Sequence, residues 1–125
     1  MLNFLINCCV IFFLILSDSH ADWEYISSTE NVNFYIDRET IERANTYGSV
    51  WELQNFPSKV DSEQGSFRYY SQYDCDKRMW MYTFFSRHNG QMATGEITLQ
   101  IATPSKWRAI PPNTPASSIF KTVCN

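Results

Sequence analysis

The chain has 125 residues, of which 44% are hydrophobic and 16% aromatic, and its formal net charge is −3. A chain of this length can hold one domain with one core and is too short for two. Its near-neutral charge and its lack of a basic run argue against a nucleic-acid partner, because domains that neutralise phosphates are usually strongly basic. We therefore expect one small globular domain.

The first 21 residues have the pattern of a signal peptide. An apolar stretch, residues 4–16, is followed by polar residues and by Ser19-x-Ala21, which fits a signal-peptidase site. The stretch is too short to span a bilayer as a helix. We expect cleavage before Asp22, with no membrane segment left in the mature chain of residues 22–125. An uncleaved anchor is the alternative, because no Lys or Arg precedes Arg38.

Removal of this leader takes Cys8 and Cys9 with it and leaves two cysteines, Cys75 and Cys124. In an exported chain these two should form one disulfide, which places the protein in an oxidising compartment. Closing a loop of about 50 residues should stabilise the fold by about 4 kcal/mol in the chain-entropy model.

The N-terminal half of the mature chain has the composition of β-strands. Residues 23–27 and 32–36 are rich in aromatic and β-branched residues and predict a hairpin. Residues 37–41 predict one polar turn, with Asp37 as a candidate helix cap. Too few apolar residues recur at helical spacing to predict a long helix there. Residues 50–54 predict a strand with Trp51 and Leu53 on one face, and residues 57–65 predict a loop.

The middle of the chain predicts three further strands. In residues 67–75, alternation places Phe67, Tyr69, Tyr73 and Cys75 inward and Arg68, Tyr70, Gln72 and Asp74 outward. Residues 79–85 are apolar on both faces and predict a central strand that is covered on both sides. After a turn at Asn89-Gly90, residues 93–101 alternate cleanly. Gly95 falls at an inward position of that strand, which suggests a bulge or a close approach.

The C-terminus predicts a helix. Thr114 is a good N-cap, and Pro115 suits the first helical position because its missing N–H costs nothing there. Ala116, Ile119, Phe120 and Val123 form an apolar stripe, and Cys124 follows it. The disulfide should therefore join this terminal helix to the inner end of a sheet strand.

The mature chain has few candidates for catalytic residues. His88, beside the Asn89-Gly90 turn, is expected to be a solvent-exposed loop histidine, and Asp74 with Asp76 an ordinary solvated acidic pair. We expect no metal, no cofactor and no catalytic residue. A hydrolase would need a nucleophile–base pair or a carboxylate dyad, and neither is evident.

The candidate partner-binding residues are a scattered basic and aromatic set, which we predict to face a protein partner because Tyr and Arg are enriched in interface hot spots. An ordinary solvated sheet face is the alternative. The set consists of Arg68, Tyr70, Lys77, Arg78, Arg87 and Arg108.

Several short motifs occur in a recognisable order along the mature chain. They are Trp23-Glu24-Tyr25-Ile26, Tyr35-Ile36-Asp37 followed by Ile41, Val50-Trp51, Asp74-Cys75, Met92-x-x-Gly95, Ser105-x-Trp107-x-x-Ile110-Pro111 and Val123-Cys124. In this order and spacing the chain resembles the surface-adhesin protein E family of Gram-negative bacteria. The resemblance implies an α+β fold with a single antiparallel sheet of about six strands and a C-terminal helix on one face. Within it, Trp51, Gly95 and Trp107 look like core positions.

The resemblance also implies a function. The family's namesake is an outer-membrane lipoprotein adhesin that binds host extracellular-matrix and plasma proteins. This chain has no cysteine just after the apolar run, so we expect no lipid anchor and a periplasmic, secreted or cell-surface location. We therefore predict an exported, non-enzymatic protein-binding module whose partner is a host matrix or plasma protein, or a protein of the cell envelope. A small exported inhibitor, for example of lysozyme or a protease, is the alternative.

Overall fold

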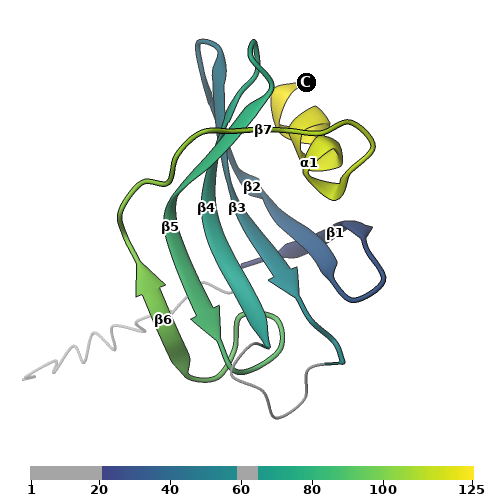
Figure 1. Ribbon diagram of the computed structural model, residues 1–125, viewed down its shortest axis with the longest axis vertical. Helices are drawn as coiled ribbons and strands as arrows, with labels where there is room; N and C mark the ends of the chain where they lie inside the picture. Colours follow the sequence, from purple (N-terminus) through teal and green to yellow (C-terminus); the bar gives the residue numbers. More distant parts are fainter. Residues whose placement is uncertain (1–20, 59–64) are drawn as a thin grey trace, which may run out of the picture.

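The computed structural model describes residues 21–58 and 65–125, and the chain forms one antiparallel sheet with one helix on it (Figure 1). The predicted signal peptide and most of the predicted 57–65 loop lie outside the described residues. The elements in chain order are β1 (Trp23–Ser28), β2 (Asn33–Ala44), β3 (Tyr47–Asn55), β4 (Ser66–Asp74), β5 (Met79–His88), β6 (Ile97–Ile101), β7 (Arg108–Ala109) and α1 (Pro115–Cys124).

The sheet follows the chain, because neighbouring strands in sequence are neighbours in space from β1 to β6. The two-residue strand β7 also pairs with β5, beyond the end of β6. The predicted fold class is confirmed: an antiparallel sheet of six main strands, a C-terminal helix on one face, and one disulfide. We call the face that carries α1 the helix face and the opposite one the back face.

The core lies between α1 and one end of the sheet. Ile119, Phe120 and Val123 of the helix pack on a group of fully buried strand residues, Ile36, Val50 and Tyr73. The predicted helix and its cap are confirmed, since Thr114 Oγ1 accepts a hydrogen bond from the amide of Ser117 at 3.2 Å. The helix packs against β1 to β4, and Figure 1 shows it at the end of the sheet remote from β6.

The disulfide ties this helix to the sheet as predicted. Cys75 directly follows β4, Cys124 is the last helical residue, and their Cα atoms are 5.6 Å apart. The amide of Cys75 also donates to the carbonyl of Thr46 in the β2–β3 hairpin, at 2.8 Å. The bond therefore fixes the C-terminal end of α1 beside two hairpin turns.

The predicted polar turn after residue 36 is wrong, because β2 continues to Ala44. The register of β2 against β3 shifts between Asp37 and Glu42, so extra residues of β2 bulge out of the ladder. Thr40 holds this irregularity together: its hydroxyl donates to the carbonyl of Asp37 at 2.6 Å and accepts from the amide of Trp51 at 3.0 Å. The polar run thus bends the strand without ending it.

Three expectations about the later part of the chain are also wrong: that Gly95 lies within a strand, that β5 is covered on both sides, and that Trp107 belongs to the core. β6 begins at Ile97, so Gly95 lies before the strand, in the 89–96 loop, with a φ of +77°, a conformation that glycine tolerates best. The close approach expected at Gly95 is confirmed, because a Cβ atom there would lie 2.2 Å from Oδ1 of Asn89. β5 is not covered on both sides, because most of its side chains are half-exposed. Trp107, expected in the core, is exposed and contacts the ring of Tyr47.

Gly48 sets how closely α1 approaches the sheet. A Cβ atom at this position would lie 2.6 Å from Cγ1 of Val123 and 3.0 Å from Cδ of Arg43. The Arg43 guanidinium donates to the carbonyl of Val123 at 3.3 Å, which seats the last turn of the helix over this glycine.

We predict that Gly48→Ala lowers the free energy of unfolding by about 1–3 kcal/mol through overpacking. Urea denaturation measures this, with exposed Lys121→Ala as the control; equal stability of Gly48→Ala and the parent protein would contradict the packing described.

Candidate functional site

Next to the area that α1 covers, the helix face of β4 and β5 carries a group of half-buried rings, of which Trp80 also packs against the core. Successive rings are 4.8–6.5 Å apart between centroids, and most pairs meet edge to face, the arrangement that aromatic rings prefer. We call this group the aromatic cluster, and its members are Phe56, Phe67, Tyr69, Trp80, Tyr82 and Phe85. The rings of the aromatic cluster contact one another, whereas the side chains of the core are covered by residues of α1.

Strand β6 extends this apolar surface to the edge of the sheet. Ile101 lies opposite Phe85 and Leu99 opposite Arg87, so both point to the helix face. Leu99 is 40% exposed. The alternation predicted for this strand is present in residues 97–101, but its apolar positions face solvent, because α1 lies at the other end of the sheet. An apolar surface of this kind is typical of sites that meet a partner.

Two residues of the predicted partner-binding set border the aromatic cluster. Arg87 pairs across the strands with Phe67, and its Nε donates to Thr98 Oγ1 at 2.9 Å. Arg108 of β7 pairs with Trp80.

Burial raises the pKa of the Tyr69 hydroxyl well above its usual range, with the negative charge of Glu52 adding to the effect, so this hydroxyl is protonated at neutral pH.

The other predicted residues lie elsewhere, so the set does not form one patch. Arg68 and Tyr70 share a face as predicted, but it is the back face, where the Arg68 guanidinium lies 3.9 Å from the ring centroid of Trp51. The ring of Tyr70 lies 5.0 Å from that of Trp51. Lys77 and Arg78 are in the exposed β4–β5 turn, where Arg78 lies over the ring of Phe120.

His88 is not the exposed loop histidine that was predicted. It is the last residue of β5, only 5% exposed, and its Nε2 shares a 2.9 Å hydrogen bond with the hydroxyl of Ser86. Burial lowers the pKa of His88, and the nearby positive charge of Arg68 lowers it further, so the ring is neutral at neutral pH. The turn signal at Asn89-Gly90 marked the end of the strand, while His88 itself still belongs to the ladder.

The acidic pair around Cys75 is also different from the prediction. Asp76 is exposed, but Asp74 is buried, and its Oδ1 accepts from the amides of Asp76 and Lys77 at 3.1 and 3.0 Å. Asp74 therefore caps the β4–β5 turn. In the part of the chain that the structure describes, no group of three or more His, Cys, Asp or Glu side chains could hold a metal ion.

A buried carboxyl lies at the boundary between core and aromatic cluster. Glu52 faces α1 from β3, is almost fully buried, and accepts a hydrogen bond from the hydroxyl of Tyr73. It lines a cavity of about 100 Å³ together with Trp80 and Ala116. Burial raises the pKa of Glu52 to about 7, although the Tyr73 hydroxyl favours the charged form. No sequence pattern marks this site, because Glu52 follows Trp51 in an ordinary alternating pattern.

Taken together, the fold and its surfaces define a small α+β domain that is closed by one disulfide and exposes an aromatic face. The family model for surface-adhesin protein E matches residues 23–125, and the chain belongs to this family. No curated protein matches the chain.

Solved structures of Haemophilus influenzae protein E have the same fold. One of them aligns with a TM-score of 0.56 at 23% identity, over 80% of this chain and 84% of its own. A second crystal form aligns with a TM-score of 0.55 at 18% identity, over 80% and 86%. Protein E from a non-typeable strain aligns with a TM-score of 0.52 at 20% identity, over 80% and 74%. At these identities the likeness concerns the fold alone.

The raised pKa of Glu52 predicts a pH dependence of stability. The folded protein holds this proton up to a higher pH than the unfolded chain does, so the stabilisation is complete below about pH 4.5 and is lost as the pH rises through 7. The loss should be about 3 kcal/mol, at about 1.4 kcal/mol for each pKa unit.

Urea denaturation between pH 4.5 and 8 measures this dependence. Glu52→Gln keeps the shape of the side chain and removes the titration, so its stability should change less over the same range. Equal slopes for the two proteins would show that Glu52 is not the group responsible.

Proposed function

We propose that this chain is an exported, non-enzymatic adhesion module that binds a protein of the host extracellular matrix or plasma. Its membership of the surface-adhesin family supports this class of function. The observation that carries the proposal is the aromatic cluster, which is half-exposed on the helix face and borders Leu99, Arg87 and Arg108.

The chemistry of this surface suits a protein partner. Tyr, Trp and Arg dominate the binding energy of protein interfaces, because they offer a large apolar area together with a hydrogen-bonding group. The cluster supplies Tyr69, Trp80 and Tyr82, and the two arginines at its border supply the charge. Because the strands fix the rings, little side-chain freedom is lost on binding.

We further propose that the chain is exported by its leader and works without a lipid anchor, in the periplasm or outside the cell. Both cysteines of the described residues are joined in the disulfide, so neither can carry a lipid. The described part of the chain contains no helix with the length and apolar character needed to cross a bilayer.

Leu99 and Gln100 provide a matched test of the binding face. They are adjacent and exposed on β6, but Leu99 lies opposite Arg87 on the helix face and Gln100 lies opposite Ser86 on the back face. We predict that Leu99→Glu weakens binding to a captured matrix or plasma protein by about thirtyfold or more, since truncating a hot-spot contact costs about 2 kcal/mol or more. Gln100→Glu should leave binding unchanged.

Biolayer interferometry against a panel of matrix and plasma proteins, with lysozyme included, provides the measurement. Binding that is lost in Gln100→Glu and retained in Leu99→Glu would move the site to the back face. Selective binding and inhibition of lysozyme would instead identify an exported inhibitor.

Export predicts a defined mass. The protein recovered from the cell envelope or medium should have the mass of a chain beginning at Asp22, less two hydrogens for the disulfide. Intact-mass spectrometry before and after reduction measures both features. A retained leader or an added lipid mass would contradict the proposed processing.

A further inference from the structure

Positively charged side chains gather at one end of the molecule, around the disulfide. Here the β2–β3 hairpin and the β4–β5 turn meet the last turn of α1, and Figure 1 shows these turns and the C-terminus at the end away from β6. The segment 106–110 joins them, because the amide of Ile110 donates to the carbonyl of Arg78 at 3.1 Å. We call this region the disulfide end. Its exposed cations are Arg43, Lys77, Arg78, Lys106, Arg108 and Lys121.

The charge of the disulfide end is opposite in sign to that of the chain. Six of the ten Lys and Arg side chains lie here, but only three of the thirteen acidic ones, Glu42, Asp74 and Asp76. Six positive and three negative side chains give this end a formal charge of +3, in a chain whose formal net charge is −3. The cations come from four separate segments, which is why the sequence contains no basic run.

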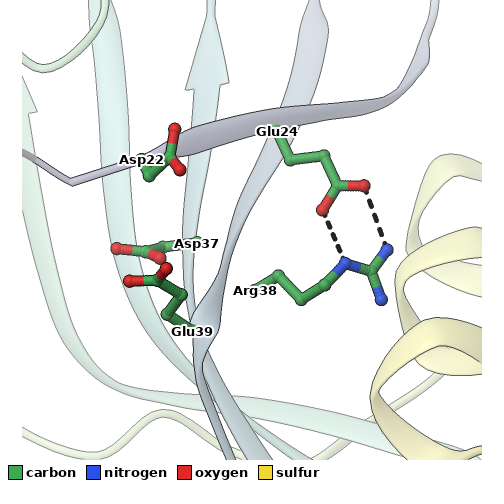
Figure 2. A pocket seen from close by; sticks show the side chains of 5 residues that line it. All are labelled: Asp22, Glu24, Asp37, Arg38 and Glu39. Atoms are coloured by element: carbon green, nitrogen blue, oxygen red, sulfur yellow. Dashed lines mark hydrogen bonds and ion pairs between the residues drawn. The ribbon is translucent and has the colours of Figure 1, made fainter.

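The cations of the disulfide end are not neutralised by acids of the same chain. Among the described residues, the one ion pair joins Arg38 to Glu24 at 2.7 Å. That pair lies in an acidic pocket at the β1 side of the sheet, which Asp22, Asp37 and Glu39 also line (Figure 2). The positive charge of the disulfide end is therefore available to an anionic partner.

Two exposed aromatic rings lie among these cations. Tyr47 of the hairpin is 39% exposed and Trp107 is 37% exposed, and their ring centroids are 6.0 Å apart. Trp107 lies between Lys106 and Arg108 in the chain. Trp and Tyr are enriched where a protein meets a membrane surface, because the ring body is apolar and its polar tip stays among the headgroups. Exposed rings between cations are thus typical of a lipid contact.

This combination suits an anionic bilayer better than an anionic chain molecule. The cations surround the tip of the molecule, where a flat array of lipid phosphates can meet several of them at once. A nucleic acid or an acidic polysaccharide is bound best by cations aligned along one path. An acidic polysaccharide also has no apolar layer to receive Tyr47 and Trp107.

We propose that the disulfide end is a peripheral membrane-binding surface, through which the protein lies on a bilayer that contains anionic phospholipids. The cations meet the lipid phosphates, and Trp107 with Tyr47 enters the headgroup region. Each Lys or Arg near such a surface strengthens binding by about fivefold at low salt. Because β6 lies at the other end of the sheet, the bound protein still presents Leu99 and its neighbours outward (Figure 1). The contact would hold a protein without a lipid anchor at a membrane.

The test measures binding of the exported protein to lipid vesicles by co-sedimentation. Vesicles of phosphatidylglycerol and phosphatidylcholine should bind it, and vesicles of phosphatidylcholine alone should not. Raising the salt from about 0.05 M to about 0.5 M should release most of the bound protein, because salt screens exposed charges. The tryptophan emission should move to shorter wavelength on binding, and Trp107→Phe should remove most of this shift.

Charge variants locate the contact. Lys77→Gln and Lys106→Gln should each weaken binding to the anionic vesicles by about fivefold, and together by about 25-fold. Gln100→Glu changes the net charge by the same amount but lies on β6, so it should leave binding nearly unchanged. All three positions are exposed, so the urea midpoints should equal that of the parent protein. Arg108 is left unchanged, because it also borders the aromatic cluster.

The outcomes separate this proposal from its rivals. Lack of binding to anionic vesicles, equal binding to neutral ones, or equal effects of Lys77→Gln and Gln100→Glu would overturn it. Heparin that binds through the same lysines more tightly than the vesicles do would replace it with a site for an acidic polysaccharide. The vesicle assay contains no protein partner, so its failure leaves the Leu99 test standing, and a failure of the Leu99 test leaves this proposal standing.

Discussion

The seating of α1 on one end of the sheet determines the rest of the structure. The helix has ten residues, a length at which an isolated helix is marginal, so its packing and the Cys75–Cys124 bond must hold it in place. Gly48 lets Val123 approach the sheet closely, and Arg43 binds the carbonyl of Val123. Because the helix is fixed at this end, it covers the strands from β1 to β4 and leaves the far end of the helix face without a second layer.

The two ends of the helix face therefore differ in chemistry. Under α1, aliphatic side chains and Tyr73 form a closed core. Beyond it, rings of the aromatic cluster shield one another at the edges and remain half-exposed. The buried carboxyl of Glu52 lies at the boundary, facing Tyr73. A small domain has too few elements to cover a six-stranded sheet completely, and the surface left open is the one that can serve recognition.

Sequence patterns predicted the parts of this structure that depend on local chemistry. Thr114-Pro115, the helical stripe and the cysteine pair are signals of this kind, and each was confirmed. Patterns failed where tertiary placement decides the outcome. The alternation of β6 is real, but whether Leu99 faces a core depends on where α1 ends. His88 was misjudged because a turn signal does not fix the last strand residue. Asp22, Asp37 and Glu39 line one pocket only because β1 pairs with β2 and β2 bulges after Asp37.

Hydroxyl-radical footprinting of the free and partner-bound protein tests the central claim most directly, since it reports the exposure of individual side chains. In the free protein, Tyr82, Phe85 and Leu99 should be oxidised, whereas Ile119 and Val123 should be protected beneath the helix. Partner binding should protect the first group and leave Trp51, Tyr70 and Phe84 of the back face unchanged. Protection of the aromatic cluster in the free protein, or of the back face in the complex, would contradict the claim.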